Sequence, residues 1–207
     1  MIMSNTNGLT MMASFQKRSF DLLISFVGLL LLWWLILLSA LLASFDTGMN
    51  GFFTQQRVGR YGKIFKVIKI RTMKVILDID TTVTTTGDAR ITTLGKFFRK
   101  TKIDELPQLI NVFLGQMSFV GPRPDVPGFA DMLEGEDRLI LSIRPGITGP
   151  ATLQYHNEED LLDTVDDPET YNREVLFPDK VRINLEYIKN YSLLSDIKYI
   201  VATVFGR

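Results

Sequence analysis

The distribution of apolar residues divides the chain into two very different parts. The 24 residues from Leu22 to Phe45 contain no charged side chain. As a helix rising 1.5 Å per residue they would extend about 36 Å, enough to cross a hydrocarbon layer of about 30 Å. The segment is too long for the apolar core of a signal peptide, and no small-residue cleavage site accompanies it. It predicts a membrane-anchoring helix at 17–46, between an N-terminal tail at 1–16 and a globular domain at 47–207.

The charges around this segment leave its topology open. Basic residues lie on both sides of it, Lys17 and Arg18 before it and a run of seven after it. Basic residues next to an apolar segment favour the cytoplasmic side of a membrane, where anionic headgroups attract them. A hairpin that enters and leaves by the same leaflet keeps both groups inside, but the segment has no proline to break its helix. A spanning helix and a re-entrant helix therefore remain alternatives.

Periodicity predicts a small sheet and several helices in the globular domain. Two β-rich runs, 52–56 and 64–71, flank a glycine-containing segment, which is typical of a hairpin. Helical spacing of apolar residues predicts four helices: 91–100, 106–114, one beginning at Pro178, and a last one capped by Ser195 or Asp196. The polar segment 78–88 predicts a loop, the proline-containing segment 118–128 an extended or turning chain, and 144–150 a tight turn. The predicted fold class is α+β and helix-dominated, with amphipathic helices suited to a headgroup boundary.

Composition excludes several kinds of chemistry. With no cysteine and one histidine, the chain has no disulfide framework, thiolate nucleophile, zinc ribbon or histidine-based metal cluster. Its 23 basic and 23 acidic side chains cancel, but they are segregated along the sequence. Residues 47–77 and 89–103 carry basic side chains and no acid, whereas 125–170 carries twelve acids against two arginines. No nucleic-acid-binding motif accompanies the basic runs, so we expect no nucleic acid partner.

An acid pair, Asp104 and Glu105, follows the second basic run. It precedes a predicted helix whose first turn holds Pro107, where a missing N–H costs nothing. Free helix N–H groups and nearby cations favour the ionised carboxylate. An ionised carboxylate can bind Mg²⁺ or attack phosphorus to give an acyl phosphate. An isolated acid pair is more often a helix cap. The hypothesis of a catalytic acid pair therefore depends on the residues around it.

Two arginines are constrained by proline and glycine, Arg123 in Gly121-Pro122-Arg123-Pro124 and Arg144 in Arg144-Pro145-Gly146. A stiff backbone presents a guanidinium to phosphate with little loss of freedom. Each motif alone is more often a surface turn. The combination of an acid pair, basic runs and two fixed arginines on a membrane anchor points to phosphate chemistry at a membrane.

The same residues lie in motifs that resemble the monotopic phosphoglycosyl transferases, also called bacterial sugar transferases. The motifs are Lys102-Ile-Asp-Glu-Leu-Pro-Gln-Leu109, Asn111-Val-Phe-Leu-Gly115, Met117-Ser-Phe-Val-Gly-Pro-Arg-Pro124 and Arg144-Pro-Gly-Ile-Thr-Gly149, with Phe53-Thr-Gln55, Lys69-Ile-Arg-Thr-Met73 and Asp88-Ala-Arg-Ile-Thr92 before them. They occur in one order and cover nearly all of the chain from Lys17 onward. Several long motifs in series make this resemblance specific.

The resemblance implies transfer of a sugar-1-phosphate from a nucleotide sugar, usually a UDP-sugar, to polyprenol phosphate. The site would face the cytoplasm at a bacterial inner membrane, and the reaction would begin a glycoconjugate such as exopolysaccharide or lipopolysaccharide. Asp104 is implied as the nucleophile of a covalent phosphosugar intermediate and as a ligand of the cofactor Mg²⁺, with Glu105 as its dyad partner. Substrate phosphates would be bound by four arginines: Arg71, Arg99, Arg123 and Arg144.

Some questions stay open at this level. A catalytically silent membrane scaffold that retains the fold is the alternative function. Family members commonly break the membrane helix with a Ser-Pro pair, which this chain lacks. The acidic stretch at 157–169 has no assigned role, and donor specificity is one hypothesis for it. The sugar, the pathway and the choice between a monomer and a homodimer are not indicated.

Overall fold

The computed structural model describes residues 8–75 and 88–206. The predicted loop at 78–88 lies outside the described residues except for Asp88. The fold is α+β and dominated by helices, as predicted. The helices are α1 (Met11–Thr47), α2 (Thr93–Thr101), α3 (Gln108–Phe113), α4 (Pro150–Gln154), α5 (Glu158–Leu162), α6 (Pro168–Tyr171), α7 (Phe177–Lys189) and α8 (Leu193–Phe205). The strands are β1 (Phe52–Val58), β2 (Ile64–Ile70), β3 (Ser118–Val120) and β4 (Gly146–Thr148).

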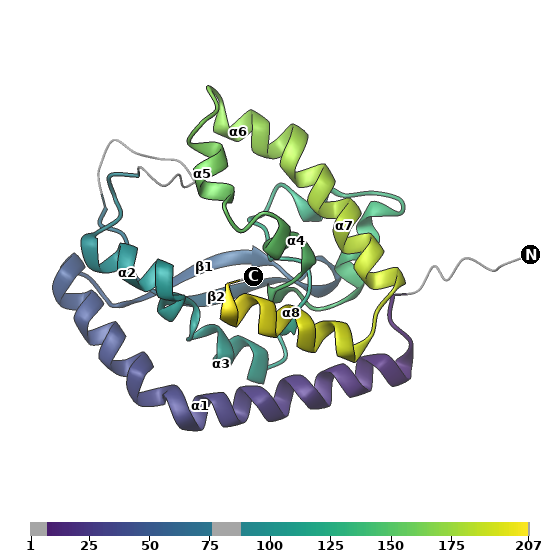
Figure 1. The fold of residues 1–207 in the computed structure, drawn as a ribbon, viewed down its shortest axis with the longest axis horizontal. Coiled ribbons are helices and arrows are strands. Elements are labelled where there is room, and N and C mark those ends of the chain that lie inside the picture. The colour runs from purple at the N-terminus through teal and green to yellow at the C-terminus, as the bar shows by residue number, and fades with distance from the viewer. Residues whose placement is uncertain (1–7, 76–87, 207) are drawn as a thin grey trace, which may run out of the picture.

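Helix α1 is a single continuous helix of 37 residues that bends around the rest of the protein (Figure 1). Thr10 caps its N-terminus by accepting a hydrogen bond from the Ala13 amide. The helix begins six residues before the predicted start of the anchor at Lys17, and by length and composition it could cross a membrane. Its bend occurs without proline and without a break in the helix, so the anchor is curved rather than a sharp hairpin.

The globular domain holds α1 at both ends. Near the N-terminal end, Lys17 Nζ lies 2.5 Å from Asp196 Oδ2 of α8. Near the C-terminal end, Ala40 packs so closely that a Cβ at Gly51 would lie 1.7 Å from its carbonyl oxygen. The inward face carries small residues, including Ser25 and Ala43, which permit this close packing. Residues 17–43 would span about 39 Å of helix, and all of that length follows the domain.

The predicted hairpin is confirmed. β1 and β2 pair antiparallel from Phe52 opposite Ile70 to Val58 opposite Ile64. In the connecting turn Tyr61 and Gly62 have positive φ of 60° and 76°. The predicted turn at 144–150 differs from the structure, since its centre is the strand β4, which pairs parallel with β3. Strands of three residues are too short to show an alternating pattern, and the flanking prolines conceal them.

The two C-terminal helices complete the core, and α8 lies against α1, β3 and β4. Pro178 lies in the first turn of α7, as predicted, and α7 buries Val181 and Ile188. Helix α8 begins earlier than expected, because Ser192 rather than Ser195 or Asp196 is the cap and accepts a hydrogen bond from the Ser195 amide. Asp196 is instead buried against Lys17. A residue that could cap the helix is thus used to hold α1.

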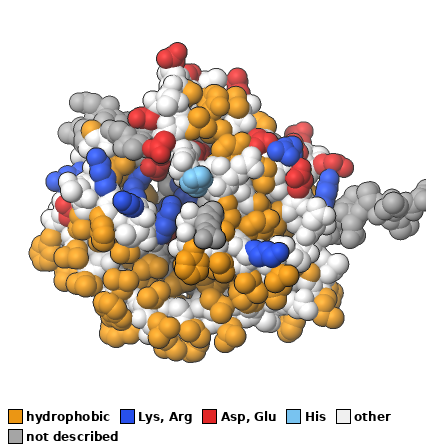
Figure 2. Space-filling model, in the orientation of Figure 1, with side chains coloured by type: hydrophobic (Ala, Val, Ile, Leu, Met, Phe, Trp, Pro, Cys, Tyr) orange, Lys and Arg blue, Asp and Glu red, His pale blue; other side chains and the backbone are white. Residues whose placement is uncertain are grey.

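One edge of the molecule is strongly apolar. Figure 2 shows hydrophobic side chains gathered along the edge occupied by α1. Besides the outer face of α1, exposed apolar side chains come from α2, α3 and its following residue, and α8: Phe97, Phe113, Leu114, Val201, Val204 and Phe205. A contiguous apolar surface of this kind marks a protein or membrane interface.

Candidate active site

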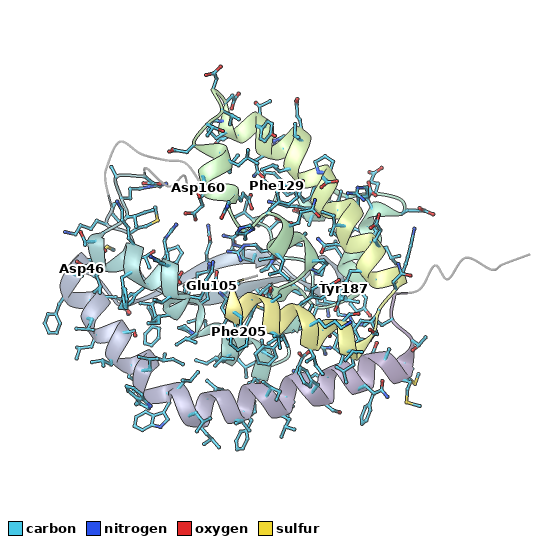
Figure 3. The ribbon with its side chains drawn as sticks, viewed as in Figure 1. Asp46, Glu105, Phe129, Asp160, Tyr187 and Phe205 are labelled. Atoms are coloured by element: carbon cyan, nitrogen blue, oxygen red, sulfur yellow. The ribbon has the colours of Figure 1, made fainter. Side chains whose placement is uncertain are left out.

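The acid pair sits in a tight connection between two short helices. Helix α2 ends at Thr101, Lys102 adopts the left-handed conformation at φ 58°, and a 3₁₀ turn covers Ile103–Glu105. Pro107 then provides the N-terminal cap position of α3. Asp104 is 7% exposed and Glu105 9% exposed. Figure 3 shows Glu105 near the centre of the molecule, beside the hairpin strands.

Glu105 is the hub of an ion-pair network. Its Oε1 lies 3.2 Å from Lys69 Nζ of β2 and 3.2 Å from Arg123 NH2. Burial raises the pKa of Glu105, but Lys69 and Arg123 outweigh burial and hold that pKa below its ordinary value. Glu105 therefore stays ionised, and it positions two cations that come from distant parts of the sequence.

Asp104 has a different environment. Its Oδ1 is buried and accepts no hydrogen bond from the described residues. Burial, together with the charge of Glu105, raises the pKa of Asp104 to about 6, while Lys69 and Arg99 oppose the rise. A buried carboxylate oxygen without a partner is costly unless something else binds to it. The two adjacent acids thus differ: Glu105 forms ion pairs with two cations, whereas Asp104 has a carboxylate oxygen without a hydrogen-bond partner among the described residues.

The side chains at the acid pair supply only some of the ligands that Mg²⁺ needs. The open oxygen of Asp104 suits a hard cation that prefers carboxylate ligands. Within residues 8–75 and 88–206, however, no group of three or more His, Cys, Asp or Glu side chains could hold a metal. Mg²⁺ commonly keeps waters and uses one or two carboxylates plus substrate phosphates. The residues present therefore fit a metal that arrives with a phosphorylated substrate.

One of the four predicted arginines contacts the acid pair, and a second lies near it. Arg123 contacts Glu105 directly, and the positive charge of Arg99 opposes the rise in the pKa of Asp104. Arg99 projects from α2, where its Nε donates to Thr72 Oγ1 at 3.2 Å. These two arginines and Lys69 surround the carboxylates with positive charge.

The other two predicted arginines lie elsewhere. Arg71 donates to the Asn50 carbonyl at 2.8 Å, with its guanidinium 5.4 Å from the ring centroid of Phe53. Arg144 donates to the Gly115 carbonyl at 2.8 Å. Neither has an ion pair with Asp104 or Glu105 in the described part of the chain. Their assignment to substrate phosphates stays a prediction.

The two proline-containing motifs nevertheless form one structural unit. Pairing of β3 with β4 joins their backbones: the Gly146 amide donates to the Pro122 carbonyl at 2.8 Å, and the Gly121 amide donates to Thr148 at 2.9 Å. A Cβ at Gly146 would lie 2.2 Å from the Gly121 nitrogen. The motifs thus share a scaffold, while Arg123 and Arg144 take different partners.

Sequence reasoning missed two cations of the site. Lys69 was visible in the family motif Lys69–Met73, but Arg71 was chosen from it. Residues two apart on a strand share a face, so alternation does not separate Lys69 from Arg71. Lys69 lies on β2 with its Nζ 3.2 Å from Glu105 Oε1, whereas Arg71 lies beyond the end of β2 and donates to the Asn50 carbonyl. Arg57 of β1 was counted only as part of a basic run. It donates to the Pro124 carbonyl at 3.1 Å, and burial together with Arg123 lowers its pKa to about 10.

The chain is similar to known proteins along most of its length. Residues 12–206 match the family model described as bacterial sugar transferase. The exopolysaccharide production protein ExoY of Sinorhizobium fredii is 31% identical, over 98% of this chain and 90% of that protein. The UDP-glucose:undecaprenyl-phosphate glucose-1-phosphate transferase of Escherichia coli is 37% identical, over 91% of this chain and 39% of that protein. An Aeromonas hydrophila UDP-N-acetylgalactosamine-undecaprenyl-phosphate N-acetylgalactosaminephosphotransferase is 32% identical, over 92% and 43% respectively.

Proposed function

The chain belongs to the bacterial sugar transferase family, and from that premise we propose that it transfers a sugar-1-phosphate from a UDP-sugar to polyprenol phosphate. The observation that carries the proposal is the contrast within the acid pair, where Glu105 is held by cations and Asp104 keeps an open oxygen. The names of the relatives from Escherichia coli and Aeromonas hydrophila include both substrate classes. Transfer to polyprenol phosphate would begin the assembly of a polysaccharide.

In the first step an Asp104 carboxylate oxygen attacks the phosphorus that bears the sugar. A bond forms between that oxygen and phosphorus, and the bond from phosphorus to the oxygen bridging to UMP breaks. UMP leaves with the bonding electron pair, and Asp104 carries the sugar phosphate as an acyl phosphate. In the second step a polyprenol phosphate oxygen attacks the same phosphorus, which forms the lipid diphosphate sugar and returns Asp104 as a carboxylate.

The surrounding cations make an attack between negative groups feasible. A diphosphate repels a carboxylate, so fixed positive charges must offset that repulsion and stabilise the departing phosphate. Lys69 and Arg123 are already oriented by Glu105, so they need little reorganisation when the donor binds. Asp104 would hold Mg²⁺, which would supply further charge neutralisation when bound.

We expect Mg²⁺ to bind with the donor rather than to the free protein. Chelation with EDTA should abolish UMP release, and added Mg²⁺ should restore it. Calorimetric titration should show Mg²⁺ binding at least about tenfold tighter in the presence of UDP, because the described side chains alone supply too few ligands. Equal Mg²⁺ affinity with and without UDP would contradict this arrangement.

The shape of α1 supports a membrane position on one leaflet. Both ends of the helix contact the same domain, at Asp196 and at Gly51. A spanning helix would place those ends on opposite sides of a layer about 30 Å thick. Because the apolar surface of α1 continues onto α2 and α8, we place this surface in the cytoplasmic leaflet with the acid pair facing the cytoplasm.

Cysteine labelling tests this topology on a background without native cysteine. We expect Met11→Cys and Asn50→Cys to react with a membrane-impermeant maleimide only in inverted vesicles, since Met11 begins α1, Asn50 follows its end, and both are exposed. Trp33→Cys, in the middle of the apolar surface, should react from neither side. Labelling of one flank from the periplasmic side of intact cells would show that the helix spans.

A further inference from the structure

The acidic segment at 157–169 folds back onto the basic side of the site. Helix α5 carries Glu158 and Glu159 in its first turn. Each carboxylate pairs with a cation from a different helix: Glu158 with Lys180 of α7 at 2.5 Å, and Glu159 with Arg99 of α2 at 2.8 Å. Figure 2 shows Lys and Arg side chains over the α2 region with acidic side chains close to them in the α5 region.

Arg99 connects this segment to the reacting carboxylate. Its NH1 donates to Glu159 at 2.8 Å, and its positive charge opposes the rise in the pKa of Asp104, five residues further along the chain. The rest of the guanidinium is held by neutral partners, Thr72 Oγ1 at 3.2 Å and the Met73 sulfur at 3.4 Å. Thr72 and Met73 therefore help to hold Arg99 in place independently of Glu159. The positive charge of Arg99 interacts both with Glu159 and with Asp104.

On the proposed function, we infer that Glu159 is an internal competitor for the donor diphosphate at Arg99 and thereby sets the affinity for the donor. A carboxylate and a phosphate oxygen accept the same hydrogen bond from a guanidinium. The pair is suited to exchange, because the Arg99 side chain is 24% exposed and that of Glu159 is 49% exposed. Ion pairs this exposed contribute little free energy, so a diphosphate can displace the carboxylate.

The same contact gives α5 two states. With the site empty, Glu159 neutralises Arg99 and holds α5 against α2. When a group with two adjacent phosphates binds, it takes over Arg99 and releases Glu159, while Glu158 keeps α5 attached to α7 through Lys180. The acidic segment then favours ligands with enough negative charge to replace a carboxylate, which discriminates against weakly charged anions.

The test is calorimetric titration of the full chain in detergent with inorganic pyrophosphate. We expect Glu159→Gln to bind pyrophosphate about two- to fivefold more tightly than the wild type, as the loss of a partly exposed competitor predicts. Asp163→Asn is the matched control, because it removes the same charge from an exposed residue at the C-terminal end of α5. Its pyrophosphate affinity should equal that of the wild type.

A double-variant cycle tests whether the gain in pyrophosphate affinity requires Arg99. In an Arg99→Gln background, adding Glu159→Gln should bring no further gain in affinity. Unchanged or weaker binding by Glu159→Gln alone would overturn the inference, as would a gain that persists without Arg99. Thermal unfolding of each variant confirms that it is folded. Failure of the proposed function would appear separately, as absence of UMP release by the wild type across a panel of UDP-sugars.

Discussion

Replacing Asp104 with asparagine should reduce UMP release from a UDP-sugar by at least about 10³-fold, because the amide cannot form the acyl phosphate. Side-chain volume and burial hardly change, so the variant should remain folded. With radiolabelled donor and no polyprenol phosphate, the wild type should release UMP in a burst and retain label on the protein. Asp104→Asn should show neither the burst nor the labelled protein.

The control for this substitution is Asp166→Asn, which removes the same charge from an exposed position. Its turnover should equal that of the wild type. Undiminished turnover by Asp104→Asn would show that Asp104 is not the nucleophile. If the wild type itself turned over no UDP-sugar of a broad panel, the silent scaffold would become the better description.

The second large effect concerns stability. Lys17, Tyr187 and Asp196 form a buried network in which Tyr187 OH donates to Asp196 Oδ1 at 2.6 Å and Lys17 Nζ lies 2.5 Å from Asp196 Oδ2. Figure 3 shows Tyr187 between α7 and the N-terminal half of α1. Asp196→Asn should lower the free energy of unfolding by about 3–5 kcal/mol, because it removes the carboxylate that pairs directly with the buried Lys17 ammonium. Urea denaturation in detergent measures the loss.

Two further variants separate the charge effect from packing. The double variant Lys17→Met with Asp196→Asn should recover most of the lost stability, since it removes the unpaired charge and keeps an acceptor for Tyr187. Glu186→Gln breaks the exposed ion pair with Arg182 and should change the unfolding free energy by less than about 0.5 kcal/mol. A double variant as unstable as Asp196→Asn alone would show that the ion pair is not the cause.

Local sequence rules predicted the elements with strong local signals. The hairpin, the helix containing Pro178 and the short helices around the acid pair follow from alternation, helical spacing and proline position. The parallel pair β3–β4 could not be predicted, because its strands have three residues each and are 28 positions apart from Ser118 to Gly146. The cap of α8 was misassigned because Ser192, Ser195 and Asp196 are all good capping residues, and tertiary burial of Asp196 decided among them.

The site residues also differ in whether a local sequence signal predicted them. Asp104, Glu105 and Arg123 were predicted as site residues because each lies in a proline- or family-specific motif, and the structure brings Arg123 against Glu105. Lys69 and Glu159 were not identified, because nothing local in β2 or α5 shows which cation or acid will meet the pair at 104–105. The sequence assigned no role to the acidic stretch at 157–169, and only the fold places Glu159 against Arg99.

The attachment of α1 through Lys17 and Asp196 also constrains the order of biogenesis. The two residues are 179 positions apart. At a synthesis rate of about 5–20 residues per second, the amino-terminal helix emerges roughly 9–36 s before its partner exists. During that interval Lys17 lacks the carboxylate that pairs with it in the folded protein, so α1 can close onto the domain only after the last helix has been made.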